Sequence, residues 1–271
     1  MLTFPETTGR RPHQPQSLRQ EYEEFILQRI EAFKEQLSRD QLLSLADDAV
    51  RELETEAADQ LLLTELMMLE HVDRLIIRRL RLPSYRRWRD RFRKLREAQR
   101  APTHWGLEAD TPLAELATTL GDGDLAVVIG AGATTAALYL AALDATVLFV
   151  DRDLAAVEAA ESRAAAEAIG SRFQAFVVNP AGGWFPDVSP WLVVIDPAAM
   201  AAVPVGEREE LLAVLKHRTR DGGMHCVLPA EPRADVIPLA PEAMQAHYAG
   251  WRVKRGRRSN PRARWFLATK P

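Results

Sequence analysis

Apolar residues in the first hundred positions recur every three to four residues, which is the period of an amphipathic helix. The segment between Gly9 and Gly106 contains no glycine, and Pro83 and Pro102 are its only prolines after Pro15. Because glycine and proline are the residues that interrupt helices, the pattern predicts an all-α domain over residues 17–102. Residues 1–16, which are rich in proline, are expected to form a disordered tail.

Two serines mark where helices of this domain should begin. Ser17 with Gln20, and Ser38 with Gln41, have the spacing of a capping box, in which serine and glutamine side chains bond to backbone N–H groups of the first turn. The predicted helices cover residues 17–37, then residues 39–82 with a break near Thr55, and finally residues 84–100.

From residue 111 onward the pattern changes to short apolar runs separated by helical segments. Five strands that alternate with helices predict a parallel, doubly wound α/β sheet over residues 103–271. Two further strands follow without a long helix between them, so we expect an antiparallel hairpin at the edge of the sheet. The predicted strands are residues 126–129, 146–150, 173–178, 191–195, 224–228, 251–255 and 264–269. The predicted helices are residues 135–143, 154–169, 207–217 and 241–249, after a short helix opened by Thr111 and Pro112.

One uncharged stretch, Leu125 to Leu143, is about long enough to cross a membrane. Gly130 and Gly132 lie in its first half, and Asp144 follows it directly. A buried strand, a tight turn and a buried helix explain this composition better than a membrane span does.

Composition limits the class of protein. The chain has 271 residues, about half of them apolar and about a quarter charged, with a formal net charge of −3, as in soluble globular proteins. Cys226 is the only cysteine, so no internal disulfide and no Cys-rich zinc cluster can form. No histidine pair has metal-ligand spacing, and we predict no metal site. The N-terminus lacks a basic head followed by an apolar run, so a cytoplasmic location is expected.

The segment from Val127 to Thr135 carries the most specific chemical signal. Gly130 and Gly132 lie between a predicted strand and a predicted helix, and Asp151 ends the next strand. Glycines allow a sharp turn and close approach of a ligand, and the helix N-terminus offers unpaired N–H groups. A carboxylate at the tip of the second strand can accept hydrogen bonds from ribose hydroxyls. The pattern favours a pocket for a nucleoside cofactor over an ordinary tight turn.

Residues 111–271 resemble the class I S-adenosylmethionine-dependent methyltransferases, whose seven-stranded sheet ends in an antiparallel hairpin. The resemblance implies S-adenosylmethionine as the cofactor and methyl transfer as the activity. In it, the glycine turn faces the methionine part of the cofactor, Asp151 holds the ribose, and Asn179 lies near the adenine. Asp196 lies where the methyl group meets its acceptor, and it is the candidate catalytic residue. The implied cofactor-binding residues are therefore Gly130, Ala131, Gly132, Asp151, Arg152, Asn179 and Asp196.

Several positions depart from the family pattern and keep two other readings open. Val128 stands where an acidic residue is usual, and Thr134 stands where a third glycine is usual. Asp196-Pro197 matches only the first half of the Asp-Pro-Pro-aromatic motif of enzymes that methylate exocyclic amines. A methyltransferase-like protein without catalysis is one alternative. An NAD(P)-dependent oxidoreductase is the other, although Thr135 occupies the position where such enzymes carry a small residue.

A general base would assist methylation of a hydroxyl or thiol acceptor. Besides Asp196, the titratable candidates are His217, His225 and His247. For each histidine a surface or packing role is the simpler interpretation.

Charge is distributed very unevenly along the helical domain. Residues 21–73 contain 15 acidic and 4 basic residues, whereas residues 74–100 contain 12 basic and 2 acidic residues. The basic run, with Tyr85, Trp88 and Phe92 among its arginines, predicts a nucleic-acid surface, with RNA favoured over DNA, where rings could stack on bases. Alternatively, the acidic and basic helices neutralise one another, or the helical domain forms a homodimer. The predicted C-terminal hairpin adds a second basic group. The candidate nucleic-acid-binding residues are Arg86, Arg87, Arg89 and Arg93 in the basic run, and Arg255, Arg257 and Arg258 in the hairpin.

Overall fold

The computed structural model describes residues 17–56, 65–109, 111–179, 186–229, 239, 241–256 and 265–271. The expected tail, residues 1–16, and the candidate residues Arg257 and Arg258 lie outside these ranges. The chain forms two compact units, residues 1–95 and 96–271. The division falls a few residues before the expected junction at residue 102, within the fourth helix.

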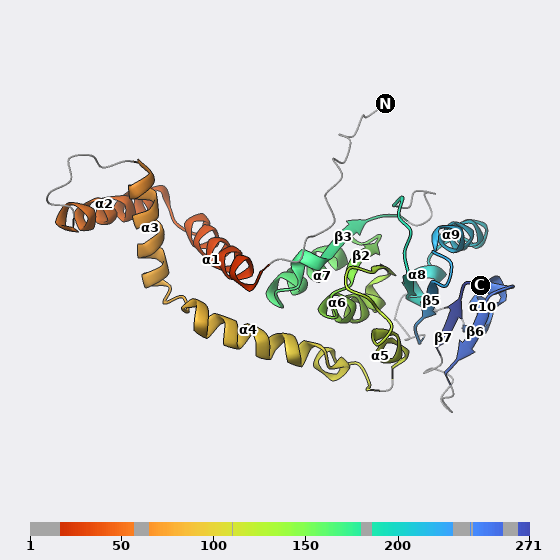
Figure 1. Ribbon diagram of the computed structural model, residues 1–271. Helices are drawn as coiled ribbons and strands as arrows, with labels where there is room; N and C mark the ends of the chain where they lie inside the picture. Colours follow the sequence, from red (N-terminus) through yellow and green to blue (C-terminus); the bar gives the residue numbers. More distant parts are fainter. Residues whose placement is uncertain are drawn as a thin grey trace. The chain divides into compact units, whose positions relative to one another are not determined.

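The first unit is helical, as its sequence predicts. Its helices are α1 (Leu18–Glu35), α2 (Arg39–Glu56), α3 (Glu65–Arg79) and α4 (Tyr85–Gln99), of which the last turn belongs to the second unit (Figure 1). Both predicted capping boxes are confirmed. Gln20 N–H donates to Ser17 Oγ while Ser17 N–H donates to Gln20 Oε1, and the pair Ser38 and Gln41 makes the same two bonds.

Apolar side chains hold the first unit together in two clusters. The first cluster joins α1, α2 and α3 through five buried residues, Ile30, Leu45, Ala49, Leu75 and Ile76. The second joins α1 and α4 through aromatic rings. Trp88, which is only 7% exposed, stacks on Phe92 at 4.7 Å between ring centroids and lies 5.5 Å from Tyr22. Of the rings that the sequence analysis proposed for base stacking, Tyr85 and Trp88 therefore pack against α1, and Phe92 packs on Trp88.

The second unit contains the predicted doubly wound sheet. Its strands are β1 (Leu125–Ile129), β2 (Thr146–Asp151), β3 (Phe173–Val177), β4 (Leu192–Ile195), β5 (Met224–Val227), β6 (Arg252–Arg255) and β7 (Phe266–Thr269). They lie in the order β3-β2-β1-β4-β5-β7-β6. The first five are parallel, and β7 is antiparallel to both β5 and β6, which confirms the seven-stranded fold and its C-terminal hairpin.

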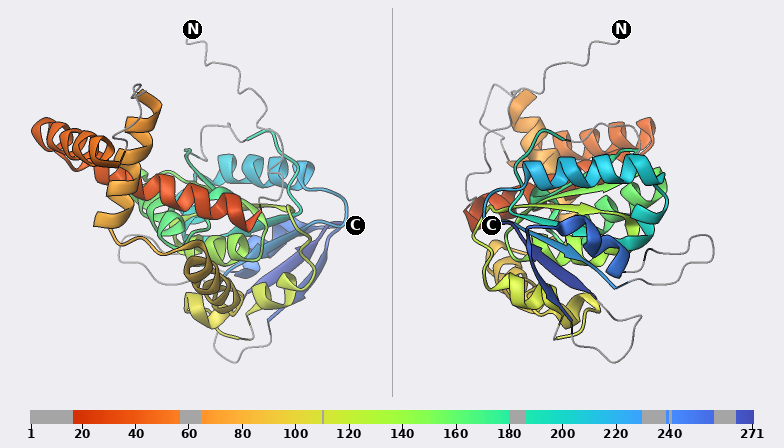
Figure 2. Two further views of the ribbon diagram at one scale, coloured as in Figure 1. Left: turned by 60° about the vertical axis from the view of Figure 1, so that its left-hand side comes forward. Right: turned by 90° about the vertical axis from the view of Figure 1, so that its right-hand side faces the viewer.

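Helices cover both faces of this sheet (Figure 2). One face packs on α6 (Thr134–Ala142) and α7 (Leu154–Ala166), and the other on α8 (Pro197–Ala201), α9 (Val205–Arg218) and α10 (Pro241–Gln245). Strand β1 shows why its sequence is uniformly apolar: Ala126 and Val128 face the first layer, and Val127 and Ile129 face the second. Among the described residues, the remaining helices are α5 (Pro112–Ala117) and the single turns Pro102–Trp105, Ala131–Ala133, Gly170–Arg172 and Ala246–Tyr248.

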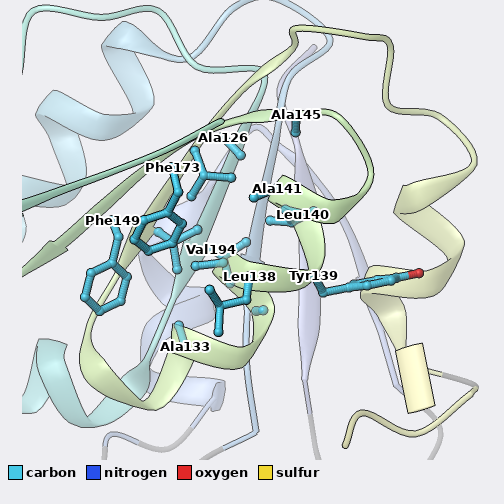
Figure 3. Close-up of a cluster of buried hydrophobic side chains, with 14 of the residues drawn as sticks. Ala126, Ala133, Leu138, Tyr139, Leu140, Ala141, Ala145, Phe149, Phe173 and Val194 are labelled. Atoms are coloured by element: carbon cyan, nitrogen blue, oxygen red, sulfur yellow. The ribbon is translucent and has the colours of Figure 1, made fainter. Parts of the chain in front are cut away.

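The uncharged stretch from Leu125 to Leu143 consists of β1, the glycine turn and α6. Helix α6 is buried from Ala136 to Ala142, and Leu138, Leu140 and Ala141 are part of the core that also contains Phe149 and Phe173 (Figure 3). Within the described ranges, no helix has both the length and the apolar character that crossing a bilayer requires.

Candidate active site

The candidate site lies at the carboxyl edge of the sheet, where the strand order reverses. Strands β1 and β4 are parallel neighbours, with Ile129 opposite Ile195, although 62 residues separate the end of the first from the start of the second. From β1 the chain proceeds to β2 and β3 on one side, and it then returns to β4 on the other side. In open α/β sheets, ligands bind at such a reversal, beside the carboxyl ends of the two strands.

Gly130 leaves β1 in a conformation that only glycine adopts easily. Its φ is 98°, and its N–H donates to the carbonyl of Val150 at 2.9 Å. A Cβ at this position would lie 2.5 Å from Ala199 Cβ and 2.7 Å from Asp196 Cβ, both closer than real contacts allow. The first glycine of the motif is therefore required by backbone geometry and by packing against α8, whether or not a ligand is bound.

Asp196 joins β4 to the glycine turn. Its Oδ2 accepts the N–H of Gly132 at 2.9 Å, and its Oδ1 accepts the N–H of Ala198 at 2.9 Å, which caps α8. The residue is 6% exposed; its bond to Ala198 is buried, and its bond to the exposed Gly132 is partly buried. Its geometry is that of a residue which holds the turn in shape. The dipeptide Asp196-Pro197 is itself a helix-start signal, an N-cap followed by proline at the first helical position, and that signal could have predicted α8.

Asp151 ends β2 beside the glycine turn, and it is 9% exposed. Its Oδ1 accepts the N–H of Asp153 at 2.8 Å. Within the part of the chain that the structure describes, its Oδ2 accepts no hydrogen bond, so one carboxylate oxygen is available to a ligand. The next residue, Arg152, is exposed.

The other predicted cofactor residues are placed less closely together. Ala131 begins the single turn that leads into α6, where Thr134 Oγ1 donates to the carbonyl of Ala131 at 2.8 Å. Asn179 is exposed and follows the end of β3, two strands away from β1. The sheet order thus brings Gly130, Asp151 and Asp196 to neighbouring strand ends, with Asn179 further out along the same edge.

Val128, at the usual acidic position, points into the core between the sheet and α6. An acidic side chain there would be buried without water. The apolar residue is therefore part of the packing of this face.

None of the three histidines lies at the carboxyl edge. His225 is the second residue of β5 and is fully buried between Thr219 Oγ1, 2.8 Å from Nε2, and the Tyr248 hydroxyl, 2.9 Å from Nδ1. Burial, together with the positive charges of Lys216 and Lys270, lowers the pKa of His225 to about 3, so its imidazole is neutral and structural. His217 is the penultimate residue of α9, shortly before β5 begins. His247 precedes β6, and the first residues of β5 and β6 both lie opposite Thr269 of β7. Both therefore lie near the opposite edge.

The described residues contain no group of three or more His, Cys, Asp or Glu side chains that could hold a metal ion.

The candidate nucleic-acid residues fall in both units. Arg86, Arg87 and Arg93 are exposed on α4, and Arg89 is half-buried with its guanidinium 3.2 Å from Asp90. Arg255 is exposed at the end of β6, in the second unit.

No protein-family model and no curated protein matches the sequence. Among solved structures, TehB from Haemophilus influenzae aligns at 14% identity and a TM-score of 0.47. That alignment covers 62% of this chain and 65% of that one, less than two thirds of the relative's length. The glycopeptide N-methyltransferase MtfA, complexed with S-adenosyl-L-methionine, aligns at 16% identity and a TM-score of 0.46, over 59% of this chain and 92% of MtfA. The N-methyltransferase NodS from Bradyrhizobium japonicum WM9 aligns at 13% identity and a TM-score of 0.46, over 59% and 92%.

The strand order itself defines the class of fold. Five parallel strands in the order 3-2-1-4-5, continued by an antiparallel seventh strand and then the sixth, form the sheet that the resemblance to class I methyltransferases implies. The second unit therefore has a Rossmann-like, class I methyltransferase fold, with its glycine turn and Asp151 at the expected strand ends.

Proposed function

We propose that the second unit binds S-adenosylmethionine and transfers its methyl group to a nucleic acid, with RNA as the first acceptor to test. The observation that carries the cofactor part of this proposal is the position of Asp151. Its carboxylate ends β2 directly beside the Gly130 turn that ends β1, and one of its oxygens is not engaged by the described residues. A carboxylate at this place accepts hydrogen bonds from the hydroxyls of a nucleoside ribose.

The residues at this edge suit binding and alignment more than proton transfer. The bound cofactor would supply a methyl group on a positively charged sulfur. The nucleophile of the acceptor would attack the methyl carbon in line with the carbon–sulfur bond, and the sulfur would leave as the neutral thioether of S-adenosylhomocysteine. Such a reaction depends chiefly on holding the two reactants at the correct distance and angle. Asp151 fixes the nucleoside, the turn after Gly130 lets the backbone approach it, and Asp196 keeps that turn in shape through Gly132. In this proposal Asp196 is a positioning residue, because both of its oxygens already accept backbone N–H groups.

Calorimetric titration with S-adenosylhomocysteine tests the cofactor part of the proposal directly. Asp151→Asn keeps an oxygen for the bond from Asp153 N–H but loses the charge, so we expect affinity to fall about 10- to 100-fold. Asp153→Asn is the matched control, because it removes one carboxylate two residues away, where asparagine still caps α7. Equal affinity in the Asp151→Asn variant and the unmodified protein would exclude Asp151 from the site.

A second candidate is a protein with this fold that does not transfer methyl groups. The observation in its favour is that the N–H of Gly132 is already bound by Asp196, which reduces what the turn offers to a ligand. Parallel titration with NAD separates the readings. Binding of S-adenosylhomocysteine alone supports the methyltransferase, and binding of NAD alone supports an oxidoreductase. Binding of neither supports the non-catalytic protein.

A further inference from the structure

Helices α3 and α4 contain three and six arginines, and the two helices differ in how many of these side chains are paired with acidic residues. On α3, Arg74 lies 3.5 Å from Glu70 and Arg79 lies 2.8 Å from Asp48, and Arg78 is hydrogen-bonded to Glu52. The acidic helix α2 thus neutralises much of α3. The alternative in which acidic and basic helices pair with each other holds for this helix.

In the part of the chain that the structure describes, most basic side chains of α4 have no such acidic partner. Its sequence contains seven basic and two acidic residues. Within the described ranges, five of these cations have no acidic partner at salt-bridge distance, and all five are exposed: Arg86, Arg87, Arg91, Arg93 and Lys94. A protein with a net charge of −3 therefore concentrates unpaired positive charge on a single helix.

These cations form two rows along the exposed side of α4. Arg87, Arg91 and Lys94 follow one another at intervals of four and three residues, and Arg86 and Arg93 are seven residues apart, so each set lies on one side of the helix. The opposite side of α4, which faces α1, carries Trp88 and the other packed rings. Up to Leu95, every exposed residue of α4 is charged.

The character of this surface narrows the kind of partner. An amphipathic helix that binds a membrane inserts an apolar face, whereas the apolar face of α4 is covered by α1. Protein interfaces have apolar and aromatic centres, which the exposed face of α4 lacks. Phosphate groups need only cations to bind them.

Two features of α4 indicate the type of nucleic acid: its aromatic rings are packed, and acidic residues lie between its basic rows. Proteins that bind single strands stack bases on aromatic rings, and here the rings are packed inside the unit. Asp90 and Glu97 lie between the two rows, so the helix is poorly suited to enter a groove lined by phosphates. Duplex RNA is recognised mainly through its backbone and shape.

We propose that the two basic rows of α4 bind the phosphate backbone of double-stranded RNA without reading its sequence. The biological meaning of this surface rests on the proposed nucleic-acid acceptor, but the binding itself is measured without the cofactor. In this proposal the substrate class of the methyltransferase is duplex RNA. The RNA binds to α4, whereas the methyl transfer takes place in the second unit.

The test is fluorescence anisotropy of the full chain with a labelled RNA duplex of about 20 base pairs, over a series of salt concentrations. Each phosphate contact contributes about 0.9 to the slope of log K against log salt concentration for a B-form duplex. The variant Arg87→Gln/Arg91→Gln/Lys94→Gln should therefore lower the slope by about 2 to 3 and weaken binding at least tenfold at low salt.

The matched control removes the same charge from arginines that already have partners. In Arg19→Gln/Arg51→Gln/Arg74→Gln, each replaced side chain belongs to a surface ion pair within one helix. This control should keep the slope. Equal loss of affinity in both variants, no binding of duplex RNA at low salt, or tighter binding of anionic vesicles or of a DNA duplex than of the RNA duplex would overturn the proposal.

Titration of the α4 variant with S-adenosylhomocysteine distinguishes this inference from the proposed function. Unchanged cofactor affinity with lost RNA binding supports the surface on α4. If the unmodified protein binds RNA but has no affinity for the cofactor, the result would support the proposal for α4 and contradict the proposed methyltransferase activity.

Discussion

The carboxylate of Asp196 holds the backbone N–H of Gly132 at 2.9 Å, across 64 positions of sequence. The same side chain caps α8 through Ala198. One buried residue thus ties the end of β4 to the turn that follows β1, at the edge where the two strands part.

Replacing Asp196 with alanine should destabilise the second unit by about 1 to 3 kcal/mol, because it removes the cap of α8 and the partly buried bond to the N–H of Gly132. Asp196→Asn should cost less, since its oxygen still accepts one of the two N–H groups. Urea denaturation followed by circular dichroism measures both. A neutral alanine variant would show that solvent replaces these bonds without loss.

Gly130→Ala should destabilise the second unit by about 2 to 5 kcal/mol, because it combines a positive φ with contacts of 2.5 and 2.7 Å. Gly123→Ala is the control for the backbone alone: its φ is 78°, and nothing lies within 4 Å of the added Cβ. It should cost only about 1 to 2 kcal/mol. Adding Ala199→Gly to Gly130→Ala should recover part of the difference, and failure to recover any would contradict the proposed clash.

His225 should make stability depend on pH in the acid range. Its pKa in the folded protein is about 3, below the ordinary value of 6.5, so the unfolded chain binds the proton more readily between these values. The contribution is complete above about pH 6.5 and is lost as the pH falls towards 3, at up to about 1.4 kcal/mol per pH unit. Denaturation at several pH values should give a shallower dependence for His225→Gln, which cannot be protonated. Parallel curves for the two proteins would contradict the assignment.

Trp88→Ala should lower the free energy of unfolding of the first unit by about 3 to 5 kcal/mol, because Trp88 is buried against Tyr22 and Phe92. Hydrogen exchange of the amides in α1 and α4 measures this local stability. Leu27→Ala is the control, since that side chain is 56% exposed on α1 and should change exchange little. Slow exchange in the Trp88→Ala variant would show that the aromatic cluster does not join these helices.

Local signals in the sequence predicted most of the elements, although the short helix α8 was not among the predicted ones. The capping boxes at Ser17 and Ser38 needed only residues three positions apart. The bond between Asp196 and Gly132 could not be predicted in the same way, because it depends on the register in which β4 pairs with β1. Trp88 shows a different limit. Its spacing from Phe92 and Tyr85 fits a packed face as well as a stacking platform, and only the position of α1 distinguishes the two.

The reversal of strand order also has a consequence for synthesis on the ribosome. Strand β1 can pair with β2 soon after both emerge, but its other edge receives β4 only once Ile195 has been made, 66 residues after Ile129. At about 5 to 20 residues per second, that edge stays open for several seconds. During this interval β1 lacks its neighbour β4 and the helices α8, α9 and α10 that cover its second face. The growing chain therefore passes through a period in which chaperones that bind exposed apolar strands have their best opportunity to act.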